Sequence, residues 1–258
     1  MKNKIKSTCN TCPYFNAEGL KKLGVKTTDF DFVVALAGNP NTGKSTVFNA
    51  LTGLRQHTGN WPGKTVSRAE GGYEYNKQKY KLVDLPGTYS LLSTSEDEEV
   101  ARNFILFGKP TVTVIVVDAS RLERNLNLVL QILQITNNAV LCLNLIDEAK
   151  RNNIKIDTRI LAKELGIPVV PTSARFKKGI PELIKTISEL ANGKIQCKPR
   201  IIKNIPKDIE NSVHKLSESI KKEYPNISNS RWIAFRLLEG DTQIIEALKT
   251  GKIANNEY

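Results

Sequence analysis

The sequence predicts an α/β fold: a mainly parallel sheet flanked by helices, followed by a small all-helical domain. From residue 31 to residue 193, β-branched apolar runs alternate with segments of helical spacing, which is the pattern of βαβ units. After residue 193 the chain becomes polar and proline-punctuated and then shows helical spacing alone. We therefore expect a flexible basic extension over 1–30, an α/β domain over 31–193, and a linker plus helical domain over 194–258.

Within the α/β region, each apolar run predicts a strand, and each stretch with leucines and isoleucines three or four residues apart predicts a helix. Strands are expected at 31–38, 71–76, 81–85, 111–120, 139–147 and 168–174, the second and third forming a hairpin. Helices are expected at 44–53, 122–135, 159–166 and 180–192. In the tail, one helical face carries Ile209, Val213, Leu216 and Ile220, and two short helices follow at 231–241 and 242–251.

Composition is that of a soluble protein, with 40% hydrophobic and 25% charged residues. No apolar run approaches the ~18 residues of a membrane span, and the basic N-terminus lacks the apolar core of a secretory signal. We expect a soluble, cytoplasmic chain. The net charge of +12 sits mostly at the two ends and comes without a nucleic-acid-binding pattern. It therefore favours basic flanks near a membrane surface at least as much as nucleic acid.

Cysteines and histidines predict no complete metal site. Cys9 and Cys12 form a lone CxxC, half of a tetrahedral site. Two free thiols in a flexible tail are the simpler interpretation, and a metal shared with another segment or chain is the alternative. Cys142 lies in an apolar run and is expected to be a small buried hydrophobe. His57 and His214 belong to no cluster of metal-ligating residues, so the sequence does not support a bound Fe²⁺.

The stretch GNPNTGKS at 38–45 has the spacing of a phosphate-binding loop between a strand and a helix. Gly38 and Gly43 permit a tight backbone path whose amides point at phosphate oxygens. Lys44 would reach the β- and γ-phosphates, and Ser45 would give its hydroxyl to Mg²⁺. The predicted nucleotide-binding residues here are Gly38, Asn41, Thr42, Gly43, Lys44, Ser45 and Thr46. We find no role for Asn39.

A second motif, DLPG at 84–87, ends the predicted strand of the hairpin. Asp84 can reach the Mg²⁺ directly or through water, and Gly87 can supply a backbone N–H to the γ-phosphate. Between the two motifs, Thr65 is the candidate switch threonine, whose hydroxyl would bind Mg²⁺ and whose amide would bind the γ-phosphate. Thr58 is its competitor in the same segment.

Two later strand ends are predicted to recognise the base of the bound nucleotide. In NLID at 144–147, the Asp147 carboxylate can accept from the N1–H and 2-amino groups of guanine, and Asn144 is expected to tie this loop to the phosphate loop. In TSA at 172–174, the segment with Ser173 and Ala174 would offer a backbone amide to the guanine O6. Because every motif sits at the carboxyl end of a strand in the right order, the set predicts a GTPase.

Together, GNPNTGKST, GNWPGKTV, DLPGTYSL, NLID and RWIAFRLLEGD resemble the cytosolic N-terminal portion of the FeoB family of bacterial ferrous-iron transporters. The resemblance covers about residues 32 to 250. It implies a GTP-binding and GTP-hydrolysing regulatory module, with a helical domain that favours bound GDP. In that family a membrane domain follows, so we expect a cytosolic fragment of a protein located in the bacterial cell membrane. The expected partners are GTP and GDP, that membrane domain and a small accessory protein, with no nucleic acid.

The resemblance also selects residue roles. It favours Thr65 over Thr58 as the switch threonine, and it implies a K⁺ site formed by Asn41 with the backbone carbonyls of Gly59 and Trp61. A K⁺ ion there supplies the positive charge of an arginine finger, so K⁺ is expected to stimulate hydrolysis, with Mg²⁺ as the other cofactor. The expected catalytic residues are Lys44, Thr65, Asn41 and Gly87. Thr88 follows Gly87 where a water-orienting glutamine is common, which predicts slow turnover.

Three features depart from the family pattern. Lys64 stands where a small apolar residue is frequent, Leu145 replaces the lysine of the common NKxD motif, and the first thirty residues match no family element. The alternative function is a freestanding RNA- or ribosome-associated GTPase, suggested by the basic balance. A third hypothesis is a membrane-associated switch whose role is binding, with hydrolysis incidental.

Overall fold

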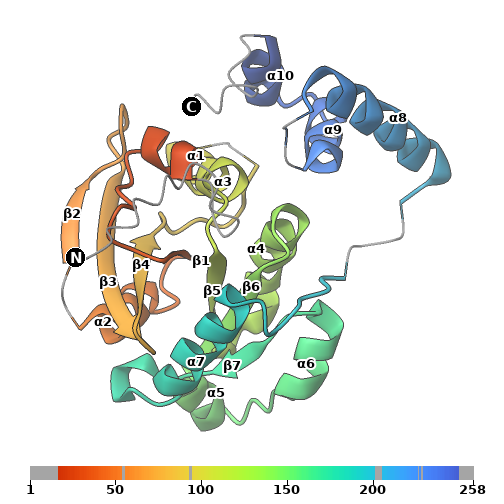
Figure 1. Ribbon diagram of the computed structural model, residues 1–258. Helices are drawn as coiled ribbons and strands as arrows, with labels where there is room; N and C mark the ends of the chain where they lie inside the picture. The colour runs from red at the N-terminus through yellow and green to blue at the C-terminus, as the bar shows by residue number, and fades with distance from the viewer. Residues whose placement is uncertain are drawn as a thin grey trace, which may run out of the picture.

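The structure is a computed structural model that describes residues 17–53, 56–92, 95–200, 205–225, 227 and 229–249. A seven-stranded sheet forms its centre, with helices on both faces and three further helices beyond one face (Figure 1). The strand order is β2-β3-β4-β1-β5-β6-β7. The α/β fold with a following helical domain, predicted from the sequence, is confirmed.

Five strands run parallel and two form an antiparallel edge. The strands are β1 (Phe32–Gly38), β2 (Gln56–Asn60), β3 (Ser67–Tyr75), β4 (Gln78–Asp84), β5 (Val112–Asp118), β6 (Ala139–Asn144) and β7 (Val169–Pro171). The predicted hairpin is β3–β4, which pairs Ala69 with Asp84 at one end and Tyr75 with Gln78 at the other. β2 was not predicted, because QHTGN is polar and lacks the alternation of apolar residues that marks a strand.

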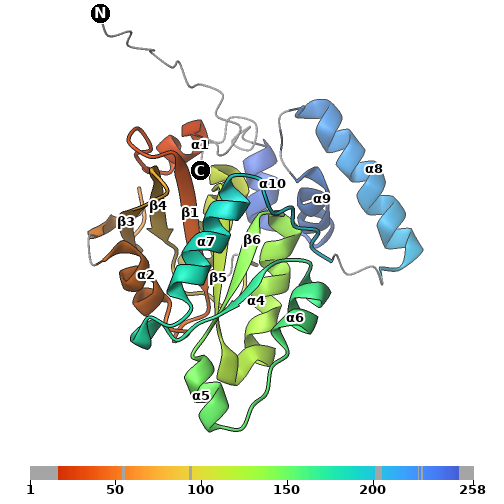
Figure 2. The ribbon, with the colours of Figure 1, turned by 60° about the horizontal axis from the view of Figure 1, so that its bottom comes forward.

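Every residue of β1, β5 and β6 is buried, because helices cover both faces of the sheet (Figure 2). One face packs against α2 (Lys44–Thr52) and α7 (Ile180–Ala191). The other packs against α3 (Glu96–Asn103), its π-helical continuation η1 (Phe104–Gly108) and α4 (Leu122–Ile135). The shorter elements are η2 (Ala119–Arg121), α5 (Ile146–Arg151), α6 (Thr158–Leu165) and η3 (Ala174–Phe176).

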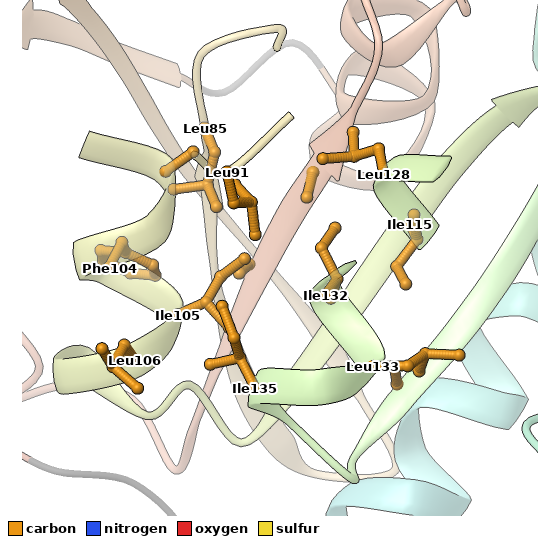
Figure 3. Packing of buried hydrophobic residues seen from close by; sticks show 14 of the residues in the cluster. Leu85, Leu91, Phe104, Ile105, Leu106, Ile115, Leu128, Ile132, Leu133 and Ile135 are labelled. Carbon is orange, nitrogen blue, oxygen red and sulfur yellow. The ribbon is translucent and has the colours of Figure 1, made fainter. Parts of the chain in front are cut away.

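The segment after β4 is anchored in the core between η1 and α4. Leu85 and Leu91, on either side of Gly87 in the chain, point toward Ile105 of η1 and Ile132 of α4 (Figure 3). All four side chains are nearly fully buried. The loop that carries Gly87 is therefore held at both ends by apolar contacts.

The helical domain consists of α8 (Lys207–Glu223), α9 (Ser230–Leu238) and α10 (Thr242–Lys249). Its apolar residues join the same hydrophobic cluster as α4 and η1. On α8, Val213 and Ile220 are buried as predicted, and Leu216 is half-buried. Ile209, which was expected on the same face, is 46% exposed near the start of the helix.

A buried arginine joins the two domains. Arg102 of α3 is 2% exposed. Its Nη2 donates to Gln243 Oε1 at 3.0 Å, and its Nη1 lies 3.4 Å from Asp241 Oδ2. The side-chain amide of Asn229 also donates to the carbonyl of Ile135 at the end of α4. The helical domain is thus attached by polar contacts as well as by the shared core.

The N-terminal boundary differs from the expected one. We expected a flexible extension through residue 30, but α1 (Ala17–Lys22) and the residues after it pack on the α/β domain. Leu20 and Val25 are fully buried in its core. Cys9 and Cys12 lie outside the described residues. Within the described ranges, no helix has both the length and the apolar character needed to cross a membrane.

We predict that Arg102→Met lowers the free energy of unfolding by about 2–4 kcal/mol, because it leaves the Asp241 carboxylate buried without its charged partner. Urea denaturation measures this. The control is Arg200→Met, which breaks an exposed pair with Glu164 and should cost about 1 kcal/mol or less. Equal losses in the two variants would contradict the role given to Arg102.

Candidate nucleotide-binding site

The phosphate-binding loop lies between the end of β1 and the start of α2. Asn41 and Gly43 adopt left-handed backbone conformations, with φ of 65° and 78°. Thr42 Oγ1 donates to the carbonyl of Asn39 at 2.9 Å and braces the turn. Such a path aims successive backbone N–H groups at one point, and the start of α2 adds its positive dipole end.

Glycine is required at both ends of this loop. A Cβ on Gly38 would lie 2.4 Å from the carbonyl oxygen of Val116, and a Cβ on Gly43 would lie 2.5 Å from Asn144 Nδ2. Both distances are far below van der Waals contact. Glycine at these two positions is therefore required by the packing around the loop, and the predicted role of Gly38 and Gly43 in phosphate binding stays a prediction.

Lys44 and Asp84 meet across the site at 2.5 Å between Nζ and Oδ1. Burial raises the pKa of the Asp84 carboxyl, and the Lys44 amine opposes that shift. Both residues line a cavity of about 280 Å³ together with Ser45, Thr58 and Gly87. The structure thus brings the predicted phosphate and Mg²⁺ residues of the two motifs to one place.

Asn144 connects three loops. Its Nδ2 donates to the carbonyl of Thr42 in the phosphate-binding loop at 2.9 Å. Its Oδ1 accepts from the backbone N–H of Ala174 at 3.1 Å and from Thr172 Oγ1 at 3.2 Å. The side chain is 1% exposed. The prediction that Asn144 ties its loop to the phosphate loop is confirmed, and the tie extends to the TSA segment.

Asp147 lies in the first turn of α5 beside Ser173, whose Oγ donates to the Asp147 carboxylate at 2.6 Å. That hydrogen bond is the main cause that lowers the pKa of Asp147, with Arg151 contributing. The carboxylate is therefore charged at neutral pH and is partly exposed, as an acceptor for a base must be. Leu145, the residue between Asn144 and the helix, takes a left-handed conformation with φ of 59°.

The switch segment, residues 59–66, does not place Thr65 at the predicted Mg²⁺ position. Thr65 donates its hydroxyl to Glu96 Oε2 at 3.2 Å, and the neighbouring Lys64 lies 2.9 Å from Glu99 Oε2. Thr65 is not among the residues lining the cavity at Lys44 and Asp84, whereas Thr58 is. Sequence reasoning missed Glu96 and Glu99. Their signal was the acidic run SEDEE at 95–99, a typical helix start, in which Ser95 Oγ accepts from the Glu98 amide.

The three predicted K⁺ ligands are not gathered in one cavity. Asn41 lines a cavity of about 130 Å³ beside Tyr89 and Asp118. Gly59 is part of β2, and Trp61 is 3% exposed with its carbonyl accepting from the Lys64 amide at 3.0 Å. Neither lines this cavity or the one at Lys44. The K⁺ site stays a prediction.

Among the described residues, no three His, Cys, Asp or Glu side chains form a group that could hold a metal ion. His57 on β2 and His214 on α8 are both exposed. Cys142 is fully buried, as expected, with its sulfur 3.2 Å from Thr172 Oγ1, and burial raises the pKa of its thiol to about 12. It is a packing residue next to the Asn144 tie.

Comparison with known protein families shows which family this chain belongs to. Residues 32–187 match the family described as ferrous iron transport protein B, and residues 206–257 match the family described as the FeoB cytosolic helical domain. The chain belongs to the FeoB family. The two matched ranges correspond to the α/β domain and to the helices α8–α10, and residues 17–30 precede the first of them.

Relatives and solved structures agree with this assignment. The Fe(2+) transporter FeoB of Escherichia coli K12 is 39% identical over 213 residues, which are 81% of this chain and 27% of that protein. The chain therefore spans about a quarter of the length of the curated relatives it matches. The cytosolic domain of Legionella pneumophila FeoB is similar with a TM-score of 0.77 and 33% identity, covering 87% of this chain and 88% of that one. The cytosolic domain of Thermotoga maritima FeoB in a GDP form is similar with a TM-score of 0.77 and 38% identity, covering 85% and 86%.

We predict that Asn144→Ala lowers the affinity for guanine nucleotides at least about tenfold and the free energy of unfolding by about 2–4 kcal/mol, because three buried hydrogen bonds are lost. Fluorescent GDP titration and urea denaturation measure the two effects. Asn192→Ala is the control, since Asn192 bonds Gln78 and Ser188 on the surface and no residue of the site. It should leave nucleotide affinity unchanged. An Asn144→Ala variant with normal affinity would refute the tie.

Proposed function

We propose that this chain binds GTP, hydrolyses it to GDP and phosphate, and serves as the cytosolic regulatory module of a ferrous-iron transporter. The observation that carries the proposal is the convergence at one sheet edge of the Lys44–Asp84 pair with the Asn144–Asp147–Ser173 cluster. Membership of the FeoB family supports the link to iron transport. The alternative, an RNA-associated GTPase, is not favoured, because residues 206–257 match the FeoB helical domain.

Each residue has a role that follows from its place. Lys44 and the amides of the phosphate-binding loop would bind the phosphate oxygens, and the Asp147 carboxylate would accept from the guanine base. Ser45 and Asp84 line one cavity with hydroxyl and carboxylate oxygens, the donor set that Mg²⁺ prefers. When bound, Mg²⁺ would neutralise the developing charge on the phosphates. Thr65 would have to leave Glu96 to join this set.

In the proposed reaction, orientation of the attacking water is the step that we expect to limit the rate. Thr88 follows Gly87, is 5% exposed, and donates its backbone N–H to the carbonyl of Gly38 at 3.3 Å. Its buried side chain is too short to orient an attacking water as a glutamine does. We therefore propose slow intrinsic hydrolysis, whose rate depends on how the 59–66 segment orders around the phosphates.

We predict that the GTP hydrolysis rate rises when K⁺ replaces Na⁺, and that Asn41→Ala removes the difference, because a monovalent cation beside the phosphates supplies positive charge in the transition state. Phosphate release measured in the two salts tests this. Asn127→Ala, an exposed residue of α4, is the control and should keep the response. Equal wild-type rates in K⁺ and Na⁺ would reject potassium activation without bearing on GTP binding.

We predict that Asp147→Asn weakens GTP binding by about 10- to 100-fold, equivalent to about 1.4–2.8 kcal/mol, and shifts preference toward xanthine nucleotides, whose 2-oxo group accepts from an amide. Competition of GTP and XTP against a fluorescent nucleotide measures the shift. Glu148→Gln, which changes the neighbouring exposed carboxylate, should alter neither affinity. Unchanged GTP affinity in Asp147→Asn would argue against Asp147 as the residue that recognises guanine.

A further inference from the structure

The segment 17–26 occupies the space between η1 and the turn that carries Trp61. On the η1 side, α1 packs closely against Gly108. A Cβ on Gly108 would lie 2.9 Å from Leu20 Cδ2 and 3.3 Å from Leu23 Cδ1. Since η1 continues α3 without a break, α1 is attached to the helix whose first turn contacts Lys64 and Thr65.

On its other side, the segment contacts the turn itself. Gly24 has a left-handed backbone with φ of 77°, and a Cβ there would lie 2.8 Å from Pro62 Cγ. Arg68 Nη1 donates to the carbonyl of Leu23 at 3.0 Å, and the same guanidinium lies over the Trp61 ring at 5.2 Å from its centroid. Trp61 in turn packs edge-on against Phe104 of η1 at 5.5 Å.

The carboxylate of Glu70 pairs with both cations that hold the N-terminal segment, Arg68 and Lys81. Glu70 lies 3.1 Å from Arg68 Nε and 2.5 Å from Lys81 Nζ, and all three side chains are at most 16% exposed. Lys81 Nζ also donates to the carbonyl of Lys26 at 2.8 Å. Two cations of β3 and β4 therefore bind backbone carbonyls of the N-terminal segment, and Glu70 holds both cations in place. Hydrogen bonds between buried charged groups and carbonyls are among the stronger ones in proteins.

The turn is held from the opposite side by α3. Glu96 accepts from Thr65, and Glu99 pairs with Lys64. Residues 61–68 thus lie between the acidic first turn of α3 and the N-terminal segment. These two are also in contact with each other, because α1 packs against η1, the continuation of α3. Thr65 can reach the cavity at Lys44 and Asp84 only if this segment moves.

We propose that residues 17–26 form an intramolecular brake on the switch segment. By fixing Trp61 and Pro62, the brake stabilises the arrangement in which Thr65 contacts Glu96, and it opposes the arrangement in which Thr65 binds Mg²⁺ and the γ-phosphate. Contacts made in one of two arrangements shift the population by their differential free energy. The brake therefore lowers the preference for GTP over GDP. This inference rests on the proposed GTPase function.

The test uses Gly24→Ala in the full chain, because a methyl group there collides with Pro62. Gly193→Ala is the matched control: Gly193 also has a left-handed backbone, with φ of 70°, but a Cβ there meets nothing within 4 Å. Both changes are made with Trp232→Phe, which leaves Trp61 as the single tryptophan. The measured quantities are the Trp61 emission maximum and the ratio of dissociation constants for GDP and a non-hydrolysable GTP analogue with Mg²⁺.

We expect Gly24→Ala to shift Trp61 emission to the red and to raise the preference for the GTP analogue about 3- to 10-fold, while Gly193→Ala does neither. A shifted emission with an unchanged preference would overturn the brake, and so would an unshifted emission. If Gly24→Ala does not fold, Leu20→Ala, which loosens α1 from Gly108 without backbone strain, is judged by the same criteria. Failure of the parent chain to bind either nucleotide would instead overturn the proposed function.

Discussion

The relative position of the loops of the candidate site depends on the buried hydrogen bonds of the Asn144 side chain. The carboxyl ends of β1, β6 and β7 lie at one edge of the sheet, but parallel strands alone leave their loops free to move apart. A single buried carboxamide donates to the first loop and accepts from the third. Because all of its hydrogen bonds are made inside the protein, their loss is not compensated by water. The phosphate-binding loop and the TSA segment are therefore held to each other through one side chain.

The contacts that Thr65 and Lys64 make with α3 are weaker than those of Asn144. The Thr65–Glu96 and Lys64–Glu99 contacts are exposed or half-exposed, and contacts of this kind contribute about 1 kcal/mol or less each. The carboxylates of the first turn of α3 stabilise the helix through its dipole, and they also give the switch residues a defined alternative partner. The hydrogen bonds of Asn144 are thus buried and strong, whereas those of Thr65 and Lys64 are weak, so movement of this segment is opposed mainly by the packing of Trp61 and Pro62.

The sequence predicted the residues of the site better than the elements around them. Gly38, Lys44, Asp84, Asn144 and Asp147 were predicted because their motifs fix both spacing and position at strand ends. The edge strand β2 was missed since QHTGN carries no apolar alternation and forms only by pairing with β3. α1 has six residues and is too short to be stable alone, so only its burial against Gly108 reveals it. The contact of Thr65 with Glu96 joins residues 31 apart in the chain, which the motif GNWPGKTV does not encode.

The docking of the helical domain has a consequence for how the protein unfolds. Trp232, Ile233 and Ile244 belong to the same cluster as Ile132 and Ile135 of α4. Removing α8–α10 would expose part of the apolar face of a helix that covers the central sheet, so loss of the helical domain would lower the stability of the α/β domain. The apolar residues of α9 and α10 therefore stabilise the α/β domain as well as their own helices.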